Sequence, residues 1–215
     1  MDILVDEAHA LKHPASADVG DIFTVARGLG LRIGQVIRLE VGDLRNLNVP
    51  GTATMIRIRP ELGKTRQERK GRTVPVAPVL VPLLRRLVVG KASRDGLFER
   101  SRPINNYTLK NIIRRAIDRG VREEVFRSAE RGNERKTHFM RAGFISGLQA
   151  LGAPKKAVKR LVGHQAADTA DGAYDPATLT MLVDAVQLVP AVVGDVNLSA
   201  CRSDRTPSQS AGEGR

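Results

Sequence analysis

The sequence predicts an α+β fold that is mainly helical and carries one small antiparallel sheet. Most apolar residues over 17–189 recur at three-to-four spacing, which indicates helices, whereas residues 52–60 and 72–78 alternate between apolar and polar side chains, as strands do. A chain of 215 residues with 41% apolar content is long enough to bury the core of one domain. We therefore expect a loose segment over residues 1–16, a single domain over 17–189 and a disordered tail over 190–215.

The first unit is a pair of helices. The helical pattern runs from Ala17 to about Arg38 and is interrupted near Gly28 and Gly30. Because glycine favours breaks and turns, we expect two helices here, with Arg32 on the first turn of the second one.

A β-hairpin follows. The stretches "TATMIRIRP" (52–60) and "RTVPVAP" (72–78) are its predicted strands, and the polar, basic connector "ELGKTRQERKG" between them has a glycine near each end. A helix over about 79–88 comes next, with Pro82 in its first turn, where proline is tolerated.

The rest of the chain predicts four further helices, over residues 105–119, 137–152, 154–163 and 177–189. Glycine marks the end of the second and the third. The last helix is amphipathic, with one apolar stripe made of Leu179, Leu182, Val183, Val186 and Val189.

The net charge of +12 is concentrated in the middle of the chain. Residues 51–150 carry 23 Lys and Arg against 9 Asp and Glu, a balance of +14, whereas residues 1–50 balance at −2 and residues 151–215 at 0. A basic segment inside a folded domain is typical of nucleic-acid binding. The simpler alternative is a solvated surface that aids solubility.

Several function classes find no support in the sequence. The single Cys201 excludes a disulfide within the chain and a cysteine-based zinc site. We find no Gly-rich phosphate loop, serine nucleophile elbow or HExxH motif, and no apolar run or signal pattern that would take the chain into a membrane. We expect a cytoplasmic, nucleoid-associated protein that uses no metal or other cofactor.

Three short motifs contain residues suited to chemistry. The first is "GLRIGQVIRL" with Arg32, the second "THFMRAGF" with His138 and Arg141, and the third "LVGHQAADTADGAYDP" with His164 and Tyr174. His138 and Arg141 are three residues apart and so share a helix face. Each motif alone has a structural explanation, such as an arginine at a helix end.

Tyrosine is rare in this chain, which has two. Tyr107 shares a helix face with Ile112 and Ala116, so we interpret it as a packing residue. Tyr174 stands among small polar residues with no apolar rhythm around it, which suits a side chain that must reach a ligand.

In this order the motifs resemble the catalytic domain of the tyrosine site-specific recombinases, the phage-integrase family, over roughly residues 17–189. The resemblance implies a tyrosine-recombinase-like fold in which Arg32, Arg141, His138 and His164 surround the scissile phosphate of DNA. Without a metal ion, fixed cationic donors must stabilise the charge that develops on the phosphate oxygens.

The resemblance also assigns the remaining chemistry. Tyr174 would be the nucleophile that forms a 3′-phosphotyrosyl intermediate, and His138 would assist its deprotonation. Lys64, in the hairpin, would protonate the leaving 5′-oxygen. Arg66, Arg69 and Lys70 lie close enough in the sequence to be mistaken for it.

The chain departs from the family pattern at several points. Gln35 stands where the family usually has an acidic residue that braces the arginine, and the residues after Arg141 are Ala-Gly-Phe rather than His-Thr-Phe. The interval from His164 to Tyr174 is one residue longer than usual. We expect the 31 residues before Arg32 to be too few for the separate DNA-clamping domain that family members carry.

Further cations are expected to contact the DNA backbone without reading its sequence. They are Arg66, Arg69, Lys70, Arg114, Arg115, Lys155, Lys156, Lys159 and Arg160. The resemblance implies a homo-oligomer, a tetramer on DNA, through the 177–189 helix. Docking of that helix within its own chain is equally compatible with the sequence.

The predicted function is therefore DNA strand cleavage and rejoining for integration, excision or resolution, without metal or ATP. Two alternatives stay open. One is strand relaxation like that of a type IB topoisomerase, which uses a similar residue set. The other is a truncated, catalytically idle DNA-binding remnant.

Overall fold

The computed structural model describes residues 16–63, 70–98, 111, 112, 114, 115, 139–164 and 175–189. Three predicted segments lie wholly or mostly outside the described residues. They are the tail over 190–215, the loose segment over 1–16 except for its last residue, and most of the 105–119 helix. What is described is mostly helical with one three-stranded antiparallel sheet, which is compatible with the predicted α+β class.

The first two helices form as the sequence predicts. Helix α2 spans Ser16–Leu29 and helix α3 spans Ile33–Val36, and the break between them falls at Gly30, whose φ of 61° is a left-handed conformation that suits glycine. Helix α2 is embedded in the core, since Ile22 and Phe23 are completely buried. Each such side chain contributes about 1.5–3 kcal/mol through burial.

The sheet contains the predicted hairpin and one strand more. Strand β2 (Met55–Ile58) pairs with β3 (Arg72–Pro75), and the predicted strands were longer than those observed. Strand β1 (Leu44–Arg45) pairs with the other edge of β2 and was not predicted, because two residues are too few to show an alternating pattern.

Short 3-10 turns link these elements. They are η1 (Val41–Asp43), η2 (Pro60–Leu62) and η4 (Pro78–Leu80). Arg59, just after β2, forms ion pairs with Glu40 and Asp43 at 3.0 and 3.1 Å, which ties η1 to the sheet.

Helix α4 (Val81–Val88) follows η4 and confirms the predicted 79–88 helix. Its apolar face points inward through Leu84, which is fully buried. Arg86, on its other side, pairs with Asp21 of α2 at 2.8 Å, so the two helices are joined by a charge pair as well as by packing.

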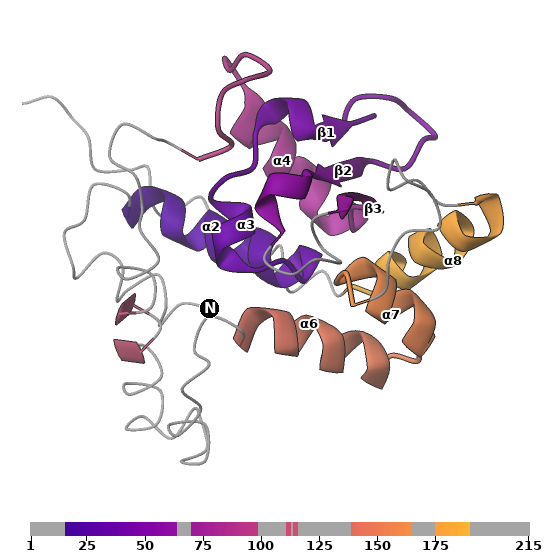
Figure 1. Cartoon of the computed structure of the whole chain (residues 1–215). Helices are drawn as coiled ribbons and strands as arrows, with labels where there is room; N and C mark the ends of the chain where they lie inside the picture. The colour runs from indigo at the N-terminus through magenta and orange to yellow at the C-terminus, as the bar shows by residue number, and fades with distance from the viewer. Residues whose placement is uncertain are drawn as a thin grey trace, which may run out of the picture.

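The C-terminal part consists of three helices arranged along one side of the molecule (Figure 1). Helix α6 (Phe139–Ala150) packs on α2, helix α7 (Lys155–Leu161) packs on α8 (Pro176–Gln187), and α8 also contacts β3. The three predicted helices in this region are confirmed.

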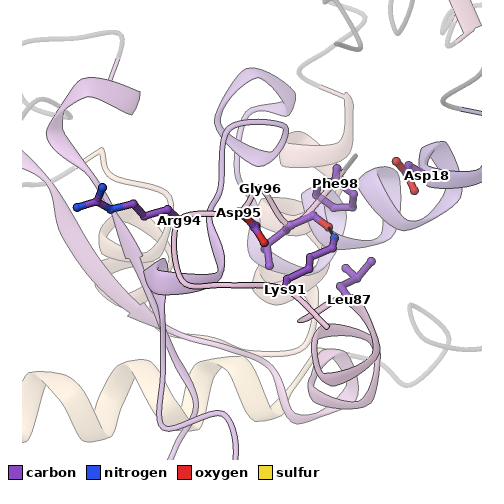
Figure 2. Close-up of a pocket in the computed structure, with 8 residues that line it drawn as sticks. Asp18, Leu87, Lys91, Arg94, Asp95, Gly96 and Phe98 are labelled. Carbon is purple, nitrogen blue, oxygen red and sulfur yellow. Dashed lines mark hydrogen bonds between the residues drawn. The ribbon is translucent and has the colours of Figure 1, made fainter. Parts of the chain in front are cut away.

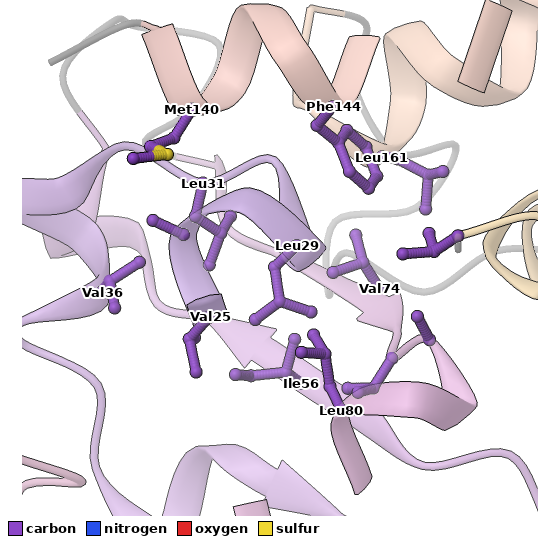
Figure 3. Packing of buried hydrophobic residues seen from close by; sticks show 14 of the residues in the cluster. Val25, Leu29, Leu31, Val36, Ile56, Val74, Leu80, Met140, Phe144 and Leu161 are labelled. Atoms are coloured by element: carbon purple, nitrogen blue, oxygen red, sulfur yellow. The ribbon is translucent and has the colours of Figure 1, made fainter. Parts of the chain in front are cut away.

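Helix α6 closes the core over the α2–α3 junction. Figure 3 shows Met140 and Phe144 of α6 pointing toward the buried cluster that contains Leu29 and Leu31. Met140 is 1% exposed and Phe144 5% exposed, so these two side chains fix how closely α6 approaches the junction. That approach decides where Arg141, next to Met140 in the chain, is held.

Candidate active site

Arg141 occupies the centre of the candidate site. Its side chain is 3% exposed and donates hydrogen bonds to two backbone carbonyls, from Nη1 to Gly30 at 3.1 Å and from Nη2 to Val162. A guanidinium is a planar fork of donors, so two bonds in different directions fix its orientation. Arg141 thus joins α6 to the α2–α3 junction and to the end of α7.

Each of these carbonyls lies two residues before a predicted site residue. Gly30 precedes Arg32 by two positions, and Val162 precedes His164 by two. Two residues of chain span at most about 7 Å. The single side chain of Arg141 therefore brings the segments of Arg32 and His164, which are far apart in sequence, to one place.

Glycine at position 30 makes this arrangement possible. A Cβ atom built there would lie 2.4 Å from Cδ1 of Phe144, and the φ of 61° would strain any side chain. A side chain at this position would push α6 outward and lengthen the bond from Arg141. The "GLRIG" motif therefore contributes its first glycine as well as its arginine.

Arg32 is the N-cap residue of helix α3, one position before the first turn on which it was predicted, and it is half-buried. Its backbone N–H donates to Oε1 of Gln35 at 3.1 Å, and Nε2 of the same glutamine donates to the carbonyl of Leu62 at 3.3 Å. Gln35 is 2% exposed. It braces the Arg32 segment against the hairpin stem, and a glutamate could not do so, because an ionised carboxylate has no hydrogen to donate to Leu62.

The end of α7 holds His164 through backbone geometry. Gly163, at φ 77°, donates its N–H to the carbonyl of Arg160 at 3.0 Å, and the N–H of His164 donates to Lys159 at 2.8 Å. These two bonds form a Schellman motif, in which glycine supplies the left-handed residue after the helix. The side chain of His164 is exposed at the surface.

The other predicted catalytic residues lie outside the described residues. They are Lys64, His138 and Tyr174, together with the hairpin cations Arg66 and Arg69. Directly after Tyr174, Asp175 caps helix α8, since its Oδ1 accepts the N–H of Thr178 at 3.0 Å. The structure therefore brings together the segments of three predicted site residues and does not test the remaining three.

Most of the described cations predicted to contact DNA are exposed. They are Lys70, Arg114, Arg115, Lys155, Lys156 and Lys159. Arg160 differs, because it is 8% exposed and its Nη1 donates to Oγ1 of Thr178 in α8 at 3.2 Å. Its side chain joins α7 to α8, so Arg160 is not among the exposed cations available to DNA.

Arg72 is a buried cation beside the site that the sequence reasoning did not single out. It is 4% exposed, and its Nε donates to the carbonyl of Leu161 at 3.3 Å. One signal was available, since alternation along β3 puts Arg72 on the same face as Val74, which is 1% exposed. From the sequence alone, however, a basic residue beside a polar connector is expected to lie at the surface.

Burial perturbs two carboxylates away from these residues. It raises the pKa of Asp21 above its usual value, although the charge and hydrogen bond of Arg86 oppose the shift. It also raises the pKa of Asp43, against a backbone hydrogen bond from Glu40 and the charge of Arg59. Both carboxylates serve structural ion pairs.

A pocket of about 650 Å³ lies elsewhere and contains none of the predicted catalytic residues. Its lining includes Lys91, which donates from Nζ to the carbonyl of Leu97 at 2.6 Å. Arg94 and Asp95 also line the pocket, and Figure 2 shows the Arg94 side chain pointing away from Lys91. Within the described residues no cluster of three His, Cys, Asp or Glu could hold a metal ion, and no helix is long and apolar enough to cross a membrane.

Comparison with known families identifies the class of protein. Residues 3–178 match the phage integrase family, so the chain belongs to that family and carries a tyrosine recombinase catalytic domain. This confirms the resemblance read from the motifs. No curated protein and no solved structure matches the chain.

Proposed function

We propose that this protein is a site-specific recombinase that cleaves and rejoins DNA strands through a covalent 3′-phosphotyrosine intermediate. Family membership supports the enzyme class and an action on DNA. The roles of individual residues belong to the proposal: Arg32, Arg141, His138 and His164 around the phosphate, Tyr174 as nucleophile and Lys64 as general acid.

The proposed step is balanced without a cofactor. The phenolic oxygen of Tyr174 attacks phosphorus and loses its proton to His138, while the bond to the 5′-oxygen breaks and that oxygen takes a proton from Lys64. The phenol has an ordinary pKa of about 10, so neighbouring cations favour its ionised form. The phosphodiester is exchanged rather than hydrolysed, so a 5′-hydroxyl can reverse the step without ATP.

The observation that carries the proposal is the position of Arg141 between the Arg32 and His164 segments. A phosphate held there would meet donors fixed by the fold before the charge develops, and such preorganised donors stabilise a transition state without having to reorganise. Arg141 is 3% exposed, so contact with a phosphate requires the groups that cover it to move aside. Arg32 and His164 are the more accessible members of the set.

The experiment is covalent trapping on DNA. The protein is incubated with suicide duplexes nicked beside candidate cleavage sites and with supercoiled plasmid, and protein–DNA adducts stable in SDS are counted. We expect an adduct from the wild type, none from Tyr174→Phe, and undiminished adduct from Tyr107→Phe as the matched control. Failure of the wild type on every substrate would refute strand cleavage.

The same assay separates the alternatives. Relaxation of plasmid that lacks any preferred site would favour a topoisomerase-like outcome over recombination. DNA binding with no adduct would favour the idle remnant. Neither alternative is favoured by a particular observation in the structure.

Assembly is part of the proposal. The predicted apolar stripe is buried within its own chain through Leu182 and Val186 of α8 and through Val189, which follows the helix. A contact between copies through this helix would therefore use its outer side, where Met181 and Leu188 line a pocket of about 470 Å³. Leu188→Asp should reduce tetramer formation on DNA in sedimentation experiments and leave the monomer folded. Nucleoid association in the cytoplasm likewise stays a prediction.

A further inference from the structure

The C-terminal end of α7 is held by two buried guanidiniums, of which the proposed chemistry uses one. The carbonyls of Lys159 and Arg160 are bonded within the Schellman motif. The next two, Leu161 and Val162, accept hydrogen bonds from Arg72 and Arg141 respectively. Carbonyls at a helix end carry partial negative charge, so cations there are stabilising.

Arg72 also lies against the residue that precedes His164. A Cβ atom built on Gly163 would be 2.6 Å from Nη1 of Arg72 and 2.7 Å from its Cζ. The guanidinium therefore occupies the space beside the Gly163 backbone. Any displacement of the guanidinium or of the Gly163 backbone would shift the backbone nitrogen of His164.

The backbone of Arg72 is itself anchored. It is the first residue of β3, follows Gly71 with its φ of 71°, and pairs in register with Ile58. Because its backbone is fixed in the sheet, the side chain of Arg72 holds the end of α7 in place relative to β3. Because Arg72 lies on the returning strand of the hairpin, it links that hairpin to the Gly163–His164 turn.

We propose that Arg72 is a positioning residue that sets the place of His164 at the phosphate without contacting the substrate. The role rests on the proposed function of His164. Displacing a catalytic group by about 1 Å costs roughly 100-fold in rate. Arg72→Met, which keeps an unbranched apolar stem and removes the guanidinium donors, should therefore slow single-turnover adduct formation by up to about 100-fold.

The decisive test is a double-mutant cycle on the adduct-formation rate at saturating protein. If Arg72 acts through His164, Arg72→Met should have little further effect in a His164→Ala background. A purely structural loss would lower the rate equally in both backgrounds and would overturn the proposal. Arg72→Lys keeps the charge but has no planar fork, so it should recover only part of the rate.

Arg86→Met is the matched control. Arg86 is an arginine bonded to Asp21 on α2, away from α7, so its loss should lower stability and DNA cleavage should show no coupling to His164. Affinity for DNA should stay the same in Arg72→Met and Arg86→Met, because neither removes a cation predicted to contact the DNA backbone.

A second measurement does not depend on activity. In NMR spectra, the amide of His164, bonded to Lys159, should shift and exchange faster with solvent in Arg72→Met and stay unchanged in Arg86→Met. Unchanged Gly163 and His164 amides would overturn the positioning role. If the wild type formed no adduct, the proposed function would fail, and this measurement would still decide whether Arg72 holds the turn.

Discussion

Two kinds of cation lie at helix α7, and they differ in burial and in the groups that they contact. At its C-terminal end, Arg141 and Arg72 are 3% and 4% exposed and bond backbone carbonyls. Along its solvent side, the three lysines 155, 156 and 159 are exposed. All of these groups are positively charged, but the arginines hold parts of the fold together and the lysines are surrounded by water.

The difference separates two functions that net charge alone confuses. A buried guanidinium with fixed partners is effective because its geometry is rigid, so its loss should change rates of chemistry. An exposed lysine is screened by salt and attracts phosphates without a fixed geometry, so its loss should change affinity. The variants below test whether the two sets act separately in this way.

The largest effect is expected at Gly30, which allows α6 to approach and gives its carbonyl to Arg141. Gly30→Ala places a side chain on a residue with left-handed backbone conformation and creates a clash with Phe144. Together these should lower the free energy of unfolding by about 2–4 kcal/mol. Urea denaturation measures this loss. Cleavage should fall as well, since the bond from Arg141 is displaced.

Gly90→Ala is the control for that change. Gly90 has a similar φ of 73°, but a Cβ there meets nothing within 4 Å. Gly90→Ala should lower the free energy of unfolding only by the backbone strain, about 1–2 kcal/mol, and leave the cleavage rate unchanged. Equal losses in the two variants would mean that the contact with Phe144 contributes nothing.

A smaller loss is expected at Gln35, between Arg32 and the hairpin stem. Gln35→Glu restores the acidic residue usual in the family, but here it would face the Leu62 carbonyl with no hydrogen to donate. We expect a loss of about 1–3 kcal/mol at neutral pH, measured by denaturation, because a buried acceptor is left unsatisfied. Gln35→Met, which removes both bonds, should show whether the charge or the missing donor is responsible. A fully stable glutamate variant would contradict the bracing role.

The exposed lysines should affect binding alone. Replacing residues 155, 156 and 159 together by glutamine should change stability by no more than about 0.5 kcal/mol per site and leave the single-turnover rate intact. If all three contact phosphates, the salt dependence of DNA affinity should lose about 0.9 of its logarithmic slope for each. Fluorescence anisotropy across a salt series measures the slope. A reduced cleavage rate at saturating protein would break the distinction between the two sets.

The smallest effect concerns Asp21, a buried charge outside the site. Its pKa is raised in the fold, so its contribution to stability is present at acidic pH and is lost as pH rises through that raised pKa. Asp21→Asn should therefore become more stable relative to the wild type on going from pH 4 to pH 7. The opposite trend in denaturation series would mean that the ion pair with Arg86 outweighs burial. DNA cleavage should not change.

The sequence predicted the parts of this molecule that have a strong local pattern. The helices, the break at Gly30 and the glycine that ends α7 all follow from spacing and from residues with special backbone freedom. The two-residue strand β1 and the burial of Arg72 could not be read in the same way. Both depend on contacts with distant segments, which no local pattern reports.

The candidate site shows the same division. The order of the motifs was enough to propose Arg32, Arg141 and His164 together and to predict the phage integrase family, and the family match confirms the family. Arg141 brings them together by donating two hydrogen bonds to backbone carbonyls. These bonds depend on tertiary packing, so the sequence did not predict them. Arg160 was placed on the DNA surface for its charge, but its contact with Thr178 is decided by how α7 packs on α8.

The central claim is that Tyr174 becomes covalently attached to DNA. The most direct measurement is mass spectrometry of the trapped adduct after protease and nuclease digestion. The chain has two tyrosines, and they fall in different tryptic peptides, so the peptide that carries the nucleotide identifies the nucleophile. The account predicts a nucleotide joined through its 3′-phosphate to Tyr174. A nucleotide on Tyr107 or on any other residue, or attachment through a 5′-phosphate, would contradict it.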